Sequence, residues 1–126
     1  MKPAGTVADV MLTSPKTLRA DATAGEARSQ LERPSVQLVL LAERGVFRGA
    51  VAEIPAEAPA DAPAQDFTLA APPTIAPTDS AAAAFEQASA EPLRRLVVVG
   101  EADELLGLVC LNSSRTRFCG GASPAA

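Results

Sequence analysis

Two pairs of apolar runs divide the chain and predict its strands. Residues 36–41 and 96–99 are mainly apolar and lack regular polar alternation, which is typical of strands covered on both faces. A short turn follows each run and leads into a second apolar run, at residues 46–52 and 105–111. This spacing predicts one hairpin with a longer loop in each half of the chain.

A helix is predicted ahead of the first hairpin. Thr23 and Glu26 have the spacing of a capping box, in which two side chains satisfy otherwise unpaired amides. We expect the helix to end at Pro34, because proline cannot continue the hydrogen-bond ladder.

The second half of the chain shows the same order of elements. Asp79 or Ser80 is expected to cap an alanine-rich helix that ends at Pro92. Short extended segments, at residues 16–19 and 74–76, precede the two helices. Each half is therefore predicted to be a strand, a helix and two further strands.

The two halves repeat each other at a fixed offset of 58 residues, without a gap, from residues 15–51 to residues 73–109. The matches combine turn residues with strand residues: Pro15 with Pro73, Asp21 with Asp79, Pro34 with Pro92, Leu38-Val39 with Leu96-Val97, Glu43 with Glu101, Gly49 with Gly107 and Val51 with Val109. Composition bias alone rarely produces such agreement. We expect two copies of one α/β unit, each a small three-stranded sheet with helices packed on it, related by a pseudo-twofold axis.

The expected boundaries are a first repeat at residues 1–58, a linker at 59–72, a second repeat at 73–118 and a disordered tail at 119–126. The first repeat includes an approach segment in which Val7, Val10 and Met11 share one helical face. Prolines at every fourth position between residues 55 and 63 favour an extended, semi-rigid linker.

The composition favours a single binding domain in the cytoplasm. A chain of 126 residues with 48% hydrophobic content can bury one core. The net charge of -4 repels a phosphate backbone and the only aromatic residues are four phenylalanines, so nucleic acid is not an expected partner. No secretory signal is evident and no apolar run approaches the roughly 20 residues of a membrane span, so no membrane partner is expected.

The residue types present argue against catalysis and against a metal site. The chain has no histidine, which excludes Ser-His and Cys-His nucleophile pairs, and it has no glycine-rich phosphate loop motif. Cys110 and Cys119 cannot complete a zinc site alone, and we expect both to be reduced thiols. The chain is predicted not to be an enzyme and to need no resident cofactor.

Several short motifs, some of them repeated in the second half, together carry a resemblance to a known family. They are residues 7–11, Pro15, residues 21–23, 26–27, 38–40 and 45–51 in the first half, and residues 94–99 and 106–109 in the second. Together they resemble a tandem pair of CBS (cystathionine beta-synthase) domains, over about residues 6–115. The resemblance implies a stand-alone Bateman module, whose clefts hold adenosine-containing ligands in many relatives and which usually assembles into dimers.

The resemblance also implies where a ligand would bind. Nucleotide-binding relatives carry a Ser or Thr three residues after the glycine of the last strand, and an Asp three residues later. The first repeat has Ala52 and Pro55 at these positions, and neither side chain can hydrogen bond. The second repeat has Cys110 and Ser113, with Asn112 beside them, so a pair of hydrogen-bonding side chains remains while the carboxylate is absent.

Two arginines strengthen the assignment to the second repeat. Arg94 and Arg95 precede its central strand, where relatives present a basic residue to a ligand phosphate, and a planar guanidinium suits that role. The alternative is a pair of solvated arginines. The first repeat has Val36 and Gln37 there. Ile75, on the first strand of the second repeat, is the remaining expected ligand-binding residue.

The sequence therefore predicts a regulatory or sensor module that takes an adenosine-type or related small ligand, such as an adenine nucleotide or S-adenosylmethionine, mainly at its second repeat. The alternative is a dimerising scaffold with decayed ligand sites that docks on an unidentified protein partner. A homodimer is expected through the helices near residues 22–31 and 81–88. Arg115 and Arg117 are expected to be solvated charges.

Overall fold

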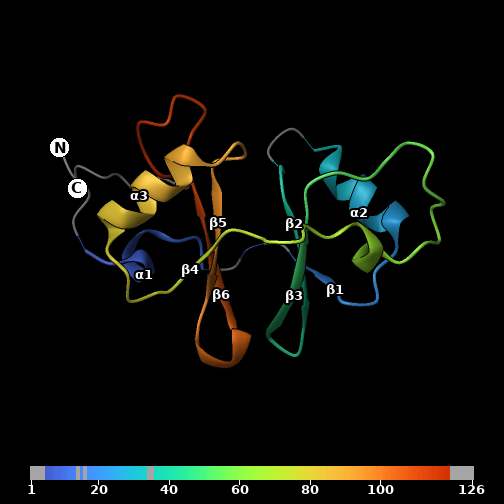
Figure 1. Ribbon diagram of the computed structural model, residues 1–126, viewed down its shortest axis with the longest axis horizontal. Helices are drawn as coiled ribbons and strands as arrows, with labels where there is room; N and C mark the ends of the chain where they lie inside the picture. The colour runs from blue at the N-terminus through green and yellow to red at the C-terminus, as the bar shows by residue number, and fades with distance from the viewer. Residues whose placement is uncertain (1–4, 14, 16, 34–35, 120–126) are drawn as a thin grey trace. The chain divides into compact units, whose positions relative to one another are not determined.

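The computed structural model describes residues 5–13, 15, 17–33 and 36–119, and its helices and strands alternate along the chain (Figure 1). In chain order the elements are α1 (Val7–Val10), β1 (Thr17–Arg19), α2 (Ala24–Leu31), β2 (Val39–Glu43), β3 (Val46–Val51), the 3-10 helix η1 (Ala64–Phe67), β4 (Thr74–Ile75), α3 (Ala81–Ala90), β5 (Arg95–Val99), the 3-10 helix η2 (Glu101–Asp103) and β6 (Leu105–Cys110). The predicted α/β class is confirmed. Pro34 and the expected tail beyond Cys119 lie outside the described residues.

Two compact units make up the chain. The first-repeat unit is Lys16–Pro72, and the second-repeat unit combines Met1–Pro15 with Pro73–Ala126. Each unit holds a three-stranded sheet with the same topology, in which the middle strand pairs in parallel with the first and antiparallel with the third: β1-β2-β3 and β4-β5-β6. The repeat seen in the sequence is thus a repeat of strand pairing.

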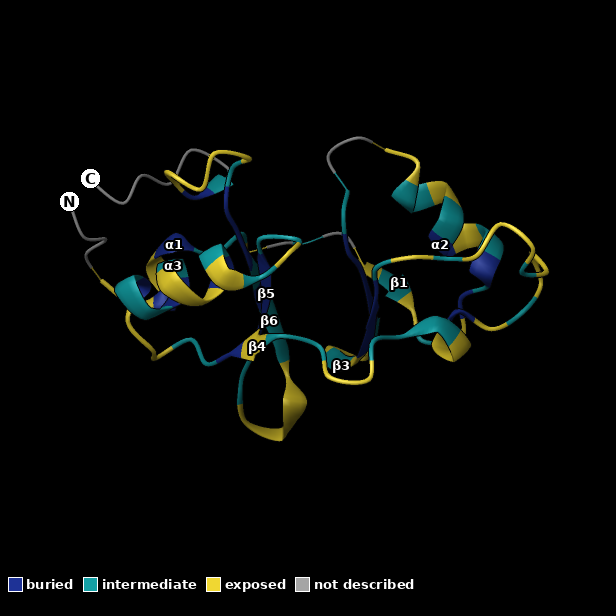
Figure 2. Cartoon of the chain, turned by 45° about the horizontal axis from the view of Figure 1, so that its top comes forward, coloured by how far each residue is buried: buried dark blue, intermediate teal, exposed yellow. Residues whose placement is uncertain are grey.

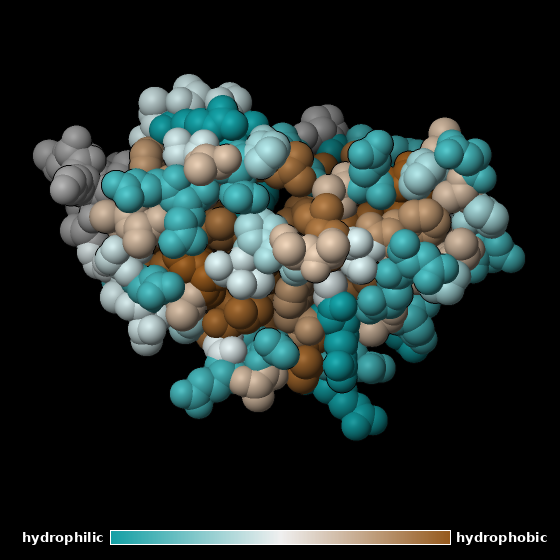
Figure 3. All heavy atoms as spheres, in the orientation of Figure 1, coloured by the Kyte–Doolittle hydropathy of each residue, from teal (hydrophilic) through white to brown (hydrophobic). Residues whose placement is uncertain are grey.

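Each unit has its own apolar core. In the first-repeat unit, Ala27 of α2 packs with Leu41 of β2 and Val51 of β3, and in the second, Ala84 of α3 packs with Val98 of β5. Small helix residues let the helices lie close to the sheets. Buried residues face the sheets while the outer helix surfaces are exposed (Figure 2). On the visible face, hydrophilic residues are interspersed with patches of exposed hydrophobic residues (Figure 3).

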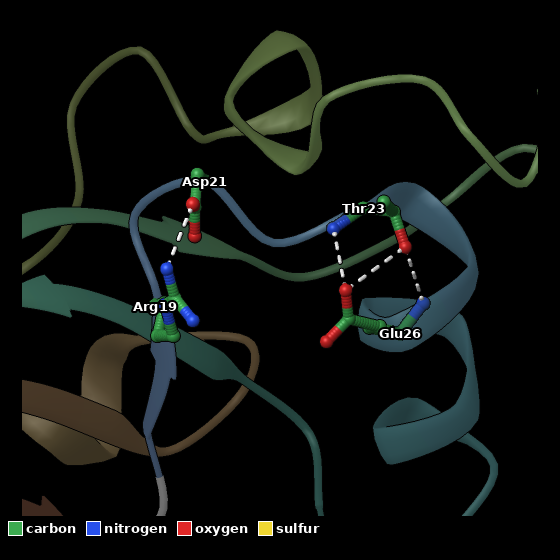
Figure 4. Close-up of polar contacts among 4 residues, drawn as sticks. All are labelled: Arg19, Asp21, Thr23 and Glu26. Carbon is green, nitrogen blue, oxygen red and sulfur yellow. Dashed lines mark hydrogen bonds and ion pairs between the residues drawn. The ribbon is translucent and has the colours of Figure 1, made fainter.

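The predicted capping box begins α2. The Thr23 hydroxyl accepts a hydrogen bond from the amide of Glu26, and the Glu26 carboxylate accepts one from the amide of Thr23, both at 3.2 Å (Figure 4). Asp21, two residues before Thr23, is not part of this capping box and forms an exposed ion pair with Arg19 at 3.1 Å. Ser80, one of the two expected caps of α3, accepts from the amide of Ala83 at 3.0 Å. These carboxylates and hydroxyls therefore serve helix starts rather than acid-base chemistry.

The N-terminal segment packs against the second repeat, and the prediction that it approaches the first repeat is wrong. Val7 is 0% exposed within the core of the second-repeat unit, and its amide donates to the backbone carbonyl of Asp79 at 2.8 Å. Leu12 and Leu108 exchange backbone hydrogen bonds at 2.8 and 3.1 Å, so the segment also covers the edge of β6. In Figure 1, α1 lies beside α3.

The proline-rich segment after β3 is docked rather than an extended linker. The amides of Ala24 and Gly25, at the start of α2, donate to Ala62 and Ala60, and Ala64 is fully buried in the first-repeat core. The Arg28 guanidinium adds hydrogen bonds to backbone carbonyls of the same segment, at 2.9 and 3.0 Å. Backbone carbonyls in the turns between the prolines accept hydrogen bonds from the first amides of α2, which would otherwise be unpaired. A prediction based on polyproline conformation does not include this pairing.

The matched glycines of the two third strands mark close backbone crossings. A Cβ on Gly107 would lie 2.6 Å from the Leu12 carbonyl oxygen, and one on Gly49 would lie 2.6 Å from a methyl of Thr68. Both crossing segments come from the stretch that precedes a repeat. Glycine recurs at this offset because each third strand is crossed at the same place.

Candidate functional site

Arg95 is the charged residue that the fold buries most clearly. It begins β5, the middle strand of the second-repeat sheet, and is 7% exposed. Its Nη1 donates to the carbonyl oxygen of Leu93 at 3.0 Å and to those of Arg94 and Leu111 at 3.5 Å each. Among the described residues no carboxylate lies within ion-pair distance of Arg95, since the one ion pair found there joins two residues of the first-repeat unit.

Arg94 adds a second positive charge at the same place. Its backbone is in the left-handed region, with φ of 58°, and its Nε donates to the Leu111 carbonyl at 3.4 Å. Burial lowers the pKa of Arg95, and the neighbouring charge of Arg94 lowers it further. The two guanidinium groups therefore place two positive charges around the Leu111 carbonyl oxygen, and we call Arg94, Arg95 and this carbonyl the positive corner. Because Arg95 is buried, the alternative of two solvated arginines does not hold for it.

Cys110 lies directly opposite Arg95 in the β5-β6 ladder. It is 5% exposed and forms a disulfide with Cys119, with an S–S distance of 2.03 Å and a Cα–Cα distance of 5.2 Å. The prediction of two reduced thiols is therefore wrong for this structure. The bond holds the end of a segment that turns back beside β6, residues 112–119, which we call the C-terminal hook.

Asn112 organises this hook. Its Oδ1 accepts from the amides of Thr116 and Arg117 at 2.8 and 3.2 Å, and its Nδ2 donates to the hydroxyls of Ser114 and Thr116 at 3.1 and 2.9 Å. Ser113 is exposed, and its hydroxyl makes no hydrogen bond with another described residue. The side chain of Asn112 is thus used within the hook, whereas that of Ser113 is available.

The remaining expected residues take structural positions. Ile75 pairs with Val98 and belongs to the core of the second-repeat unit. Arg115 is not merely solvated, because its Nε donates to the Ser89 carbonyl at the end of α3, at 3.0 Å. Arg117 is exposed, as expected. The structure gathers Arg94, Arg95 and Cys110 around the Leu111 carbonyl, and it draws Asn112 into the hook.

The anchoring role of the hook was missed from the sequence. Its signal was a closely spaced set of turn-forming side chains, Asn112, Ser114 and Thr116, followed by Phe118, the one aromatic residue of that region. Phe118 is 1% exposed in the core of the second-repeat unit. An apolar side chain directly after a turn motif indicates a docked segment rather than a frayed end.

The first repeat has an open depression that the sequence did not predict. It has a volume of about 470 Å³ and lies over the start of α2, lined by Leu18, Thr23, Gly25, Glu26, Ser29, Gln30 and Ala60. The first amides of α2 are already paired with the cap and with the docked segment. Ala52 and Pro55 stand in the first repeat where nucleotide-binding relatives carry a Ser or Thr and an Asp. Ala52 has no polar side-chain atom, and the backbone carbonyl of Pro55 accepts a hydrogen bond from Arg28.

Within the described ranges, no group of three or more His, Cys, Asp or Glu side chains is placed to hold a metal ion. The same part of the chain contains no helix with the length and apolarity needed to cross a bilayer.

Comparison with known proteins identifies the architecture. A family model described as "CBS domain" matches residues 64–112, which run from η1 in the first-repeat unit through the whole of β4, α3, β5 and β6. This part of the chain is similar to a CBS domain. No curated protein sequence matches this chain. The family match and the duplicated strand pairing confirm the resemblance to a tandem CBS pair.

Solved structures show the same fold over most of the chain. A CBS-pair protein, CBSX2 from Arabidopsis thaliana, is 15% identical with a TM-score of 0.71, covering 85% of this chain and 89% of that one. A CBS domain pair/ACT domain protein from Thermotoga maritima is 21% identical with a TM-score of 0.71, covering 85% and 90%. The CBS domain of a bacterial CNNM/CorC family Mg2+ transporter, solved in complex with ATP, is 15% identical with a TM-score of 0.63, covering 83% and 80%. The last of these structures shows that a domain with this fold can bind ATP.

Proposed function

We propose that this CBS pair is a regulatory module that binds an adenine nucleotide or a related adenosine-type anion, mainly at its second repeat. The observation that carries the proposal is Arg95, a buried guanidinium whose partners among the described residues are neutral carbonyls. Buried charges in proteins are usually paired, so an anionic ligand would complete this corner. The ATP complex of a CBS relative with the same fold supports the choice of ligand class.

The chemistry of the corner suits a phosphate. Arg94 and Arg95 present two guanidinium groups at one point of the sheet, and guanidinium–phosphate hydrogen bonds are charge-assisted. Ser113 is exposed two residues beyond Leu111 and can donate its hydroxyl. Ile75 contributes to the apolar strands that would surround the base.

The two repeats are unequal as ligand sites. The first has Gln37 where the second has Arg95, and Ala52 where the second has Cys110. The second repeat still lacks the ribose-binding carboxylate of nucleotide-binding relatives. Losing one charge-assisted hydrogen bond weakens binding by roughly 1.5–3 kcal/mol, so we expect micromolar affinity at best.

Thermal unfolding of the full chain with and without ligand tests the proposal. Ligand at one hundred times its dissociation constant should stabilise the protein by about 2.7 kcal/mol, which raises the melting midpoint by more than about 5 °C. We expect this shift with ATP, ADP or AMP, and we expect Arg95→Ala to remove most of it. A screen that includes S-adenosylmethionine and guanine nucleotides defines the ligand class.

Gln37→Ala is the matched control, since Gln37 occupies the position of Arg95 in the other repeat. It should leave the ligand-induced shift almost unchanged. Equal losses from the two substitutions would contradict a site that is confined to the second repeat. No shift with any ligand would reject the ligand-binding function.

A second candidate function is a dimerising scaffold whose ligand sites have decayed. Two observations favour it: the Asn112 side chain is used within the hook, and Cys110 is held in a disulfide. The scaffold would self-associate through the outer faces of α2 and α3. Sedimentation equilibrium decides this point, because a chain that stays monomeric at micromolar concentration has no such interface.

A further inference from the structure

The disulfide of the second-repeat unit lies beside the buried arginine. Arg95 and Cys110 are direct partners in the antiparallel β5-β6 ladder, so their side chains leave the sheet on the same face. The Arg95 Nη1 and the Cys110 sulfur lie 3.5 and 3.8 Å from the same oxygen, the carbonyl of Leu111. The guanidinium and the sulfur therefore approach the same carbonyl from neighbouring side chains, and a nearby cationic group favours the thiolate form of a cysteine.

The two sulfur-bearing residues differ in access. Cys110 is 5% exposed inside β6, whereas Cys119 is partly exposed at the end of the hook. An incoming thiolate therefore reaches Cys119 more readily. Thiol–disulfide exchange is fastest when the sulfur that leaves is the better-stabilised thiolate, and that sulfur is Cys110.

We propose that the Cys110–Cys119 bond is a redox-active disulfide, reversibly reduced by external thiols, with Cys119 as the attacked sulfur and Cys110 as the leaving thiolate. In the first step an external thiolate bonds to the Cys119 sulfur, the S–S bond breaks, and its electron pair leaves on the Cys110 sulfur beside Arg95. In the second step another external thiolate attacks the external sulfur of the mixed disulfide and releases Cys119 as a thiolate. The protein gains two electrons, and two external thiols become one external disulfide.

Reduction changes the charge of the corner without dismantling it. A Cys110 thiolate opposite Arg95 lowers the local net charge by one unit, whereas the disulfide sulfur is neutral. The hook keeps its Asn112 hydrogen bonds, the Arg115 contact with α3 and the buried Phe118 ring. The switch is therefore mainly electrostatic, and it requires no ligand.

Reduction of the oxidised full chain by glutathione, followed by acid quenching, tryptic digestion and mass spectrometry, tests the order of attack. Cleavage after Arg95, Arg115 and Arg117 places Cys110 and Cys119 on different peptides. We expect the early glutathione adduct on the peptide that begins at Phe118. An early adduct on the Cys110 peptide, or no disulfide in protein purified without reductant, would overturn the proposal.

Substitution of Arg95 tests the stabilised leaving group. Arg95→Gln should slow reduction at neutral pH by roughly threefold or more, because it removes the positive charge that favours the leaving thiolate. Arg95→Lys should restore most of the rate, and Arg48→Gln, an exposed charge in the other unit, should leave it unchanged. Equal rates for folded Arg95→Gln and wild type would refute the role of Arg95. If Arg95→Gln does not fold, the adduct position in the wild-type chain still decides the mechanism.

Discussion

Replacing Val7 by Asp is expected to unfold the second-repeat unit. Val7 is 0% exposed within that unit's core, although it lies in sequence next to the first repeat. An unpaired carboxylate at such a position costs several kcal/mol, a large part of the stability of a small domain. Amide hydrogen exchange should therefore show lost protection in β5 and β6, with β2 and β3 affected less.

Ala8→Asp is the matched control for this substitution. It adds the same charge one residue further along α1, at an exposed position. We expect its effect to stay within about 0.5 kcal/mol. Loss of protection in β2 and β3 instead of β5 and β6 would mean that the segment belongs to the first repeat.

Truncating Phe118 to Ala is expected to destabilise the second-repeat unit by about 3–5 kcal/mol, measured by urea unfolding. The ring is 1% exposed and packs edge-to-face on Phe85 of α3, with centroids 5.6 Å apart and an interplanar angle of 86°. The backbone of Phe118 also forms an isolated β-bridge with Leu111, the residue after β6. Phe118 therefore anchors the hook to α3 and to the core of the second-repeat unit.

Arg117→Ala is the neighbouring control, because Arg117 is exposed. It should change the unfolding free energy by less than about 0.5 kcal/mol. If Phe118→Ala lost no more than Arg117→Ala, the hook would not be part of the folded unit.

The strand pairing of both repeats could be predicted from the sequence because its determinants are local. The apolar run of β5, the polar turn after it and Gly107 in β6 each have a physical reason to occur where they do, and each has a counterpart 58 residues earlier. The cap of α2 was equally local, since Thr23 and Glu26 contact each other across three residues.

The partner of the N-terminal segment could not be predicted, because apolar spacing shows which face is buried but not what covers it. Val7 and Val10 would suit either helix–sheet core, and only the three-dimensional contacts assign them to the second. The docked proline-rich segment was missed for a related reason. Its backbone carbonyls pair with α2, and carbonyl pairing leaves no trace in side-chain chemistry.

The candidate site was predicted in part. The family resemblance pointed to Arg94 and Arg95, and both side chains lie at the Leu111 carbonyl, while their role toward a ligand stays a prediction. The sequence does not show whether Asn112 binds a ligand or stabilises a turn, because its side-chain amide can hydrogen bond in either role. The disulfide was missed because two cysteines nine residues apart pair only if the chain reverses between them, and that reversal depends on the hook.

Amide chemical shifts of the isotope-labelled full chain, titrated with ATP, test the central claim most directly. The account predicts saturable shifts at Arg95, Leu111 and Ser113, whereas the first-repeat counterparts Gln37 and Glu53 stay unperturbed. Shifts of equal size in both repeats, shifts confined to the first repeat, or an unchanged spectrum at millimolar ATP would contradict a nucleotide site at the second repeat.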